Sequence, residues 1–361
     1  MIGQTLAIFV DAYRDLNARK LFWITLILSA VVVAAFSLLG FDSTGLKLAT
    51  AHVNMPQASF WYKVTFRRVV IGLWLTWAAT VLALISTAGI FPELISGGTI
   101  DLYLAKPIGR ARLFITKYLT GLFFVTLQVA VIAIGSFLDL GLRGHEWNAR
   151  LFWAIPIVVC FFSYLFGFCV LLGVKTRSTI AALLLTIVFW TLIGGVDWAE
   201  PLLLGARNVY EANARSQRDR SDEASQTLVH AQHDPKQSAI VGALQEDSDV
   251  ARREADSTER TAWWLRTSYG VLYSIKTITP KTTDTVGLLD RIIFANERDP
   301  TDPAGRQRIG QPDPSDDSAN AMKQTVEDLK SRSVGWIVGT SLAFELVLVG
   351  AAMWIFCRRD Y

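Results

Sequence analysis

Six apolar stretches are the feature that most limits what this 361-residue chain can fold into. They lie near residues 21–41, 69–91, 118–138, 151–173, 179–197 and 334–357. A helix of about 20 residues spans the hydrocarbon core of a bilayer, which is about 30 Å thick, because each residue adds about 1.5 Å. Charged residues make up only 19% of the chain, and they are concentrated outside these stretches. The sequence therefore predicts an all-α, polytopic membrane protein with six transmembrane helices.

The polar segments between the apolar stretches define the expected domains. Residues 1–20 place apolar side chains on one helical face, which predicts an amphipathic helix in the cytoplasmic interface, with a solvated leader as the alternative. Residues 21–197 would hold spans one to five, and residues 198–333 a largely helical extracytoplasmic insert. Residues 334–361 would hold span six and a cytoplasmic tail. The first stretch is too long for the apolar core of a cleaved signal peptide.

The distribution of Lys and Arg predicts the orientation. With the N-terminus inside, eleven basic residues flank the spans on the cytoplasmic side and six lie in the short external loops. Basic residues favour the cytoplasmic side, so the sequence predicts a multi-pass protein of the plasma (cytoplasmic) membrane with both termini in the cytoplasm. Arg67 and Arg68, beside the second stretch, run against this trend.

The sequence contains no recognisable catalytic or metal-binding motif. It has no GxxxxGK[ST] phosphate loop and no HExxH motif, and its three cysteines lie in or beside the apolar stretches without CxxC spacing. His230 and His233 have helical i, i+3 spacing, but two solvated histidines in a polar insert are the favoured reading. We therefore expect no catalytic residue, no metal site and no enzyme activity in this chain.

Glu345 is the one ionisable residue deep within a predicted span. A charged side chain at the centre of a transmembrane helix costs about 2.5–3.5 kcal/mol on insertion scales, so such a residue usually faces protein or a polar cavity. Two interpretations stay open: a group on a substrate path or proton-linked switch, and a structural interhelical hydrogen bond. Candidate partners at similar depth are Thr126, Gln128, Tyr164 and Thr191.

The insert changes character along its length. Residues 206–261 are polar and predict a helix that Asp234-Pro235 would break into a hairpin. Residues 262–295 are apolar and aromatic, which predicts two short amphipathic elements on the outer membrane face, separated at Thr279-Pro280. Their aromatic side chains include Trp263, Trp264, Tyr269, Tyr273 and Phe294.

A short polar segment follows the second apolar stretch. Gly97-Gly98 permits a sharp reversal, Thr99 can cap a helix near residues 98–106, and Pro107 ends it. Such a helix could sit in a groove of another protein. A basic loop that only fixes the topology is an equally good reading of these residues.

The same segment resembles a family pattern. It is similar to the GTLDLLLSKPISR-type segment of ABC type-2 export permeases. The residues that carry the similarity are, in order, Glu93, Gly98-Thr99-Ile100-Asp101-Leu102, Lys106-Pro107-Ile108-Gly109-Arg110 and Lys117. The final Arg358-Arg359-Asp360-Tyr361 resembles the RRDF-like ending of that family. The resemblance covers the membrane part of the chain and excludes the long insert.

The resemblance implies a permease subunit of an ATP-driven exporter, paired with a second permease half in a homo- or heterodimer. Cytoplasmic ABC ATPase subunits would bind ATP and Mg, and no cofactor or nucleic acid would bind this chain. The implied ATPase-coupling residues are Thr99, Asp101, Leu102, Lys106, Pro107 and Arg110. The aromatic side chains between Trp263 and Phe294 would form an external gate, and Glu345, by its depth, is the candidate for the substrate path. The alternative is a non-transporting membrane scaffold or sensor whose external insert binds a partner protein.

Overall fold

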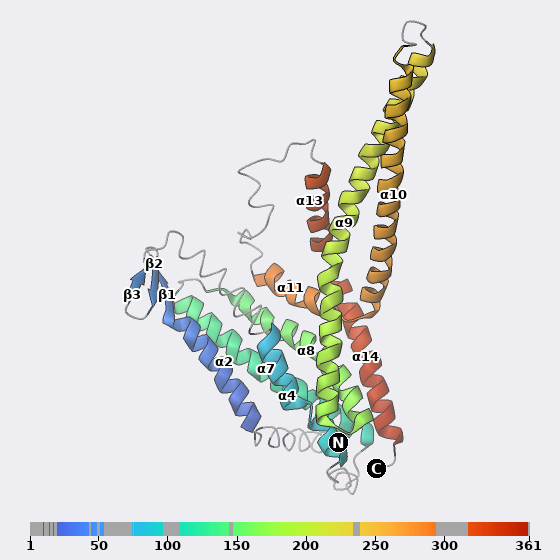
Figure 1. Cartoon of the computed structure of the whole chain (residues 1–361). Helices are drawn as coiled ribbons and strands as arrows, with labels where there is room; N and C mark the ends of the chain where they lie inside the picture. The colour runs from blue at the N-terminus through green and yellow to red at the C-terminus, as the bar shows by residue number, and fades with distance from the viewer. Residues whose placement is uncertain are drawn as a thin grey trace. The chain divides into compact units, whose positions relative to one another are not determined.

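The computed structural model describes most of the chain, and the chain divides into two compact units (Figure 1). The described residues are 10, 14, 17, 20–42, 45–48, 51–53, 74, 76–96, 109–143, 147–233, 239–293 and 317–359. Unit 1 comprises Met1–Ile193, Pro280–Pro300 and Val334–Tyr361, and unit 2 comprises Gly194–Thr279 and Thr301–Ser333.

Helices make up nearly all of the described chain. Unit 1 contains α2 (Lys20–Leu38), α4 (Ala79–Thr87), α5 (Ile90–Ser96), α7 (Arg110–Arg143), the 3-10 helix η2 (Ala149–Trp153), α8 (Ala154–Thr176), α11 (Thr282–Ile293) and α14 (Val334–Arg358). Unit 2 contains α10 (Val241–Ile278) and α13 (Asp317–Lys330). The long helix α9 (Thr179–His233) begins in unit 1 and continues into unit 2.

Five described helices are long and apolar enough to cross a membrane. They are Thr76–Ile95, Arg110–Asp139, Ala149–Thr176, Thr179–His233 and Val334–Arg358. They match five of the six predicted spans and confirm a helical protein of membrane character. The first predicted span is represented by a shorter apolar helix, Trp23–Ala35, within α2.

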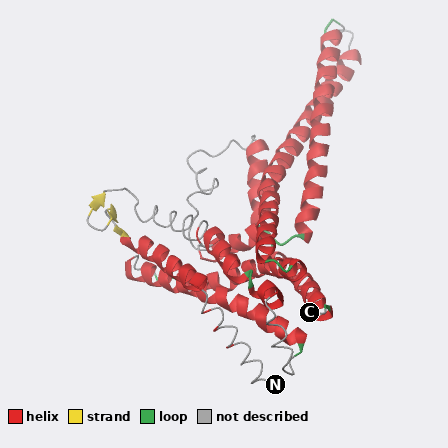
Figure 2. Ribbon diagram, turned by 60° about the horizontal axis from the view of Figure 1, so that its bottom comes forward, coloured by secondary structure: helices red, strands yellow, loops and turns green. Residues whose placement is uncertain are grey.

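A small antiparallel sheet follows α2, where the sequence predicts a helix to residue 41. Its strands are β1 (Leu39–Asp42), β2 (Gly45–Leu48) and β3 (Ala51–Val53), in the order β1-β2-β3. Gly40 and Gly45 are poor helix formers, which favours an early end of α2. Figure 2 shows that the other regular elements of the described chain are helices.

Helix α8 is the centre of unit 1. Helices α14, α7, α11 and α5 all pack against it. It carries no charged residue from Ala154 to Val174, and an α-helix satisfies its backbone polar groups internally, which suits it to an apolar surrounding. It ends at Arg177, whose left-handed backbone (φ 54°) lets its N–H donate to the carbonyl of Gly173 at 3.0 Å.

Two glycines allow the helices of unit 1 to approach closely. A Cβ atom at Gly121 of α7 would lie 2.6 Å from Cζ of Phe166 on α8. A Cβ atom at Gly167 of α8 would lie 3.2 Å from Cγ2 of Val349 on α14. Small residues at such contacts let membrane helices pack backbone to backbone.

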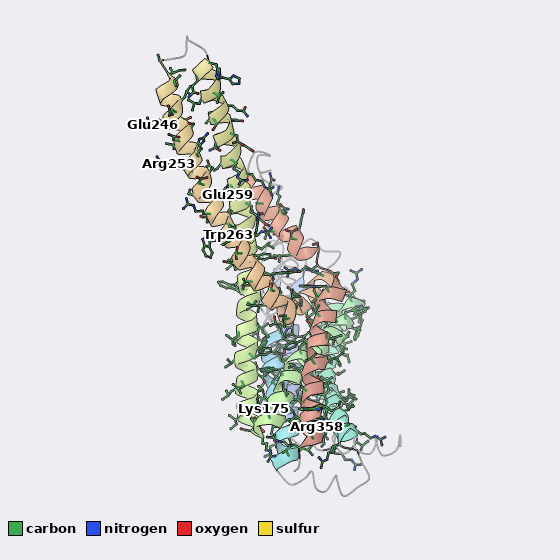
Figure 3. The ribbon with its side chains drawn as sticks, turned by 90° about the vertical axis from the view of Figure 1, so that its right-hand side faces the viewer. Lys175, Glu246, Arg253, Glu259, Trp263 and Arg358 are labelled. Carbon is green, nitrogen blue, oxygen red and sulfur yellow. The ribbon has the colours of Figure 1, made fainter. Side chains whose placement is uncertain are left out.

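Unit 2 is built on α9 and α10, which run side by side in both Figure 1 and Figure 3. Arg218 of α9 pairs with Glu259 of α10, and Nε of Arg266 lies 3.0 Å from Oε1 of Glu211. The predicted break at Asp234-Pro235 falls between the end of α9 and the start of α10, but these two residues lie outside the described residues.

The aromatic part of the insert differs from the sequence prediction. The structure has one continuous helix from Val241 to Ile278 in place of a polar helix followed by a separate short element. The stretch contains no proline, so a change of polarity alone does not end the helix. The predicted break at Thr279-Pro280 is confirmed, because α10 ends at Ile278 and α11 begins at Thr282.

Candidate functional site

Glu345 joins three helices of unit 1. Its side chain lies within α14 and the residue is only 8% exposed. The hydroxyl of Tyr118 on α7 donates to Oε1 at 2.7 Å, and Oγ of Ser163 on α8 lies 2.6 Å from Oε2. Gly167 of α8 borders the site, because a Cβ atom there would lie 3.5 Å from Cγ of Glu345. The α7–α8–α14 junction therefore holds a buried carboxyl group.

The partners of Glu345 are not those predicted from depth. Gln128 donates to the carbonyl of Ala79 at 3.4 Å, and the hydroxyls of Thr126 and Thr191 each donate to a carbonyl of their own helix. The interhelical hydrogen bond is present, but its predicted partners are wrong, because Tyr118 and Ser163 bind Glu345 in place of Tyr164 and the other three residues. Sequence position gives the height of a residue along its helix and leaves the rotation of each helix undetermined.

A second group of polar side chains lies where α11 meets α14. The backbone N–H of Lys281 donates to Oγ of Ser341 at 2.9 Å, and its Nζ donates to Oγ1 of Thr340 at 2.6 Å. The ammonium group also lies 4.3 Å from the centre of the Trp336 ring, a cation–π distance. Lys281, Ser341 and Thr285 are all fully buried.

One end of unit 1 gathers the start of α7 and the ends of α8 and α14. Nη1 of Arg110 donates to the carbonyls of Cys357 at 3.1 Å and Arg359 at 2.9 Å. Arg359 in turn donates to the carbonyl of Val174 at 2.7 Å. Cations stabilise helix C-termini, where carbonyls lack intrahelical partners. We call this the basic end; its basic residues are Arg110, Arg112, Lys175, Arg177, Arg358 and Arg359, of which Figure 3 labels Lys175 and Arg358.

Arg110 is the only predicted coupling residue that the structure describes. Its side chain is half-buried, and its guanidinium group is bound to the end of α14. The other predicted coupling residues, Thr99, Asp101, Leu102, Lys106 and Pro107, lie outside the described residues.

The predicted gate residues that are described all lie on α10, in unit 2. Trp263 and Trp264 are more than half exposed, with ring centres 4.9 Å apart (Figure 3 labels Trp263). Tyr269 lies 5.9 Å from Tyr273 between ring centres, and burial, together with the Glu200 carboxylate, raises the pKa of Tyr269. Phe294 lies outside the described residues.

Four charged side chains form a buried network in unit 2 that the sequence analysis missed. Lys276 of α10 contacts Glu200 and lies 3.3 Å from Oδ1 of Asp197, both on α9. Arg332 donates to both carboxylate oxygens of Glu200. These two acids and two bases balance one another in charge within the described residues. We call it the charge network.

The sequence does contain a signal for this network. Asp197 and Glu200 are three residues apart, so they lie on the same face of α9, and Pro201 follows them. Proline lacks the N–H that would bond to the carbonyl of Asp197. An i, i+3 acidic pair directly after an apolar stretch predicts a need for basic partners, but α10 and the Arg332 segment are too far along the chain to be identified from spacing.

The comparisons with known proteins give no family for the chain. No protein-family model matches it, and neither does any curated protein or any solved structure. Within the described part of the chain, no group of three or more His, Cys, Asp or Glu side chains could hold a metal ion.

Proposed function

We propose that this chain is the membrane-spanning permease subunit of an ATP-driven exporter of the ABC type-2 kind. A separate cytoplasmic ATPase would bind ATP and Mg, and a second permease half would complete the transporter. ATP hydrolysis in the partner would move a substrate outward through the helix bundle.

The contact between Arg110 and the end of α14 is the observation that most supports this proposal. Arg110 follows the proposed coupling segment, residues 98–106, almost directly, and it binds the carbonyls of Cys357 and Arg359. Glu345 lies on the same helix, twelve residues before Cys357, or about 18 Å away. A movement of the coupling segment would therefore reach the buried carboxyl group through one side chain and one helix.

The proposed topology has six spans. Helix α2, with 19 residues, would extend about 28 Å and serve as the first span. The basic end would lie in the cytoplasm together with both termini, because basic residues favour that side. The insert would be extracytoplasmic, and α11, which packs against η2 and α8, would lie at the outer end of the bundle.

The proposed substrate path passes Glu345. Its carboxyl group is an ionisable group at the centre of a helix bundle, and such groups often mark transport pathways. Trp263, Trp264, Tyr269 and Tyr273 of the insert would provide the external gate.

Affinity purification from the native membrane tests the proposal. The full chain, solubilised in detergent, should bring down an ATPase identified by mass spectrometry and by ATP hydrolysis in the eluate. The double substitution Asp101→Arg with Leu102→Asp should abolish this co-purification. A matched control is Asp249→Arg with Val250→Asp, which makes the same changes at exposed positions of α10.

The Asp101/Leu102 variant and the Asp249/Val250 control should differ only in ATPase binding. If the Asp101/Leu102 variant retains the ATPase as well as the control does, the coupling role is wrong. If wild-type eluates contain no ATPase but contain an external protein whose binding is lost in the Asp249/Val250 variant, the chain is a scaffold or sensor.

A further inference from the structure

We propose that the α7–α8–α14 junction is a proton-binding site. In this site Glu345 is a neutral carboxylic acid that donates its proton to Ser163 and exchanges it along the neighbouring hydroxyl groups of Tyr164, Thr285 and Ser341. The ligand is thus a proton. The inference goes beyond the proposed transport function and does not depend on it.

The hydrogen-bond count at Ser163 supports a protonated Glu345. Oγ of Ser163 lies 2.6 Å from Oε2 of Glu345 and 2.8 Å from the carbonyl oxygen of Cys160. A serine hydroxyl has one proton, so it can donate to only one of these two oxygens. With an ionised Glu345, one of the two close contacts would bring two oxygens together without a proton between them.

A proton on Oε2 of Glu345 resolves this conflict. Glu345 then donates to Ser163, and Ser163 donates to the carbonyl of Cys160. Oε1 becomes the carbonyl oxygen of the acid and accepts from Tyr118 at 2.7 Å. Each short contact then contains one proton, as expected for buried polar groups.

The surroundings of Glu345 also favour the neutral acid. Among the described residues, the titratable groups that face it are Tyr118 from α7 and Cys160 and Tyr164 from α8. All three types of side chain are ordinarily uncharged at neutral pH. Lys281 lies directly before α11, and its ammonium group is directed to Thr340 and the Trp336 ring. A buried carboxyl group without a cationic partner is more stable when protonated.

Tyr164 marks the position where the proton would leave. Its side chain is fully buried. The hydroxyls of Thr285 and Ser341 face it, and each donates to a carbonyl of its own chain segment at 2.7 and 2.8 Å. Both oxygens can therefore accept further hydrogen bonds.

The Tyr164 hydroxyl can donate to either of these two oxygens. Ser341 lies one helical turn from Glu345 on α14, and Tyr164 follows Ser163 directly on α8. The three hydroxyl groups would thus connect the acid to the end of the bundle where α11 begins.

Infrared spectroscopy of the full chain in lipid nanodiscs at neutral pH tests the protonation state. The spectrum should contain the carbonyl stretch of a carboxylic acid, above the amide I band, which shifts in deuterated water and disappears in Glu345→Gln. Glutamine has nearly the same shape and can also donate to Ser163, so this variant should fold; its elution in gel filtration checks this. If the wild-type-minus-variant spectrum contains carboxylate bands instead, the proposal is wrong.

The role of Tyr164 is tested by the rate at which that band shifts after transfer to deuterated water. Tyr164→Phe should slow the shift about tenfold, equivalent to the loss of one hydrogen bond in the exchange path. Tyr210→Phe, at an exposed tyrosine of α9, should leave the rate unchanged. Equal rates in Tyr164→Phe and the wild type would overturn the assignment of the exchange path.

Discussion

At the scale of single residues, the contact between α7 and α8 depends on a position without a side chain. A methyl group at Gly121 would lie 2.6 Å from Phe166, which is fully buried and stacked on Tyr118. Gly121→Ala should therefore destabilise the bundle by about 1–3 kcal/mol, as overpacking typically does. Thermal unfolding in detergent measures this. Gly339→Ala, where the added atom meets nothing within 4 Å, should be as stable as the wild type or slightly more stable, because alanine favours a helix over glycine. Equal losses in both variants would contradict the packing argument.

Arg110 is expected to hold the end of α14 in place. Arg110→Ala removes two hydrogen bonds to carbonyls, and hydrogen bonds to a charged group contribute about 1.5–3 kcal/mol. Amide hydrogen exchange of residues 355–359, followed by mass spectrometry, should become faster. Lys175→Ala removes a charge from the same basic end at an exposed position and should have little effect. Unchanged exchange in Arg110→Ala would show that the contact does not stabilise this end.

The residue scale is where sequence reasoning was least complete. The depth of Glu345 could be predicted, because it needs only a count along an apolar stretch. Tyr118 and Ser163 could not, since they lie 227 and 182 residues away and their choice depends on the rotation of three helices. Lys281 and Lys276 were missed because basic residues of an insert are expected in solvent.

At the scale of elements, the charge network fastens α10 to α9. Lys276→Met leaves the network with an excess negative charge, and removing one partner of a buried ion pair costs about 3–5 kcal/mol. Hydrogen exchange in residues 270–278 should therefore increase. Adding Asp197→Asn restores neutrality and should recover part of the loss.

A matched comparison separates burial from charge. Arg218→Ala removes one partner of the exposed pair with Glu259, and exposed pairs contribute little to stability. Hydrogen exchange of the flanking α10 residues should hardly change. If Lys276→Met and Arg218→Ala had equal effects, the buried network would have no special role.

Helix boundaries followed backbone chemistry more closely than polarity. The breaks at Thr279-Pro280 and between His233 and Val241 could be predicted from proline. The change from polar to aromatic residues near position 262 did not produce a boundary, because Trp, Leu and Tyr are all compatible with a helix. The small sheet β1–β3 was not predicted, since an apolar stretch gives no sharp signal for its own end.

At the scale of the whole molecule, the proposed topology predicts which positions react from each side. In a chain whose native cysteines Cys160, Cys169 and Cys357 are replaced, Val250→Cys on α10 should react with a membrane-impermeant maleimide in intact cells. Lys175→Cys at the basic end should react only after permeabilisation. The reverse pattern would invert the topology, and labelling of both positions in intact cells would exclude a sealed bundle.

The three-helix site at Glu345 also constrains how the protein is made. Ser163 leaves the ribosome 182 residues before its partner Glu345, which corresponds to roughly 10–35 s of synthesis at about 5–20 residues per second. During this interval α7 and α8 are already complete, yet the hydroxyls of Tyr118 and Ser163 lack the carboxyl group that binds them. The bundle can close only after the whole insert has been translated. Slow translation of the insert therefore also delays the folding of the membrane domain.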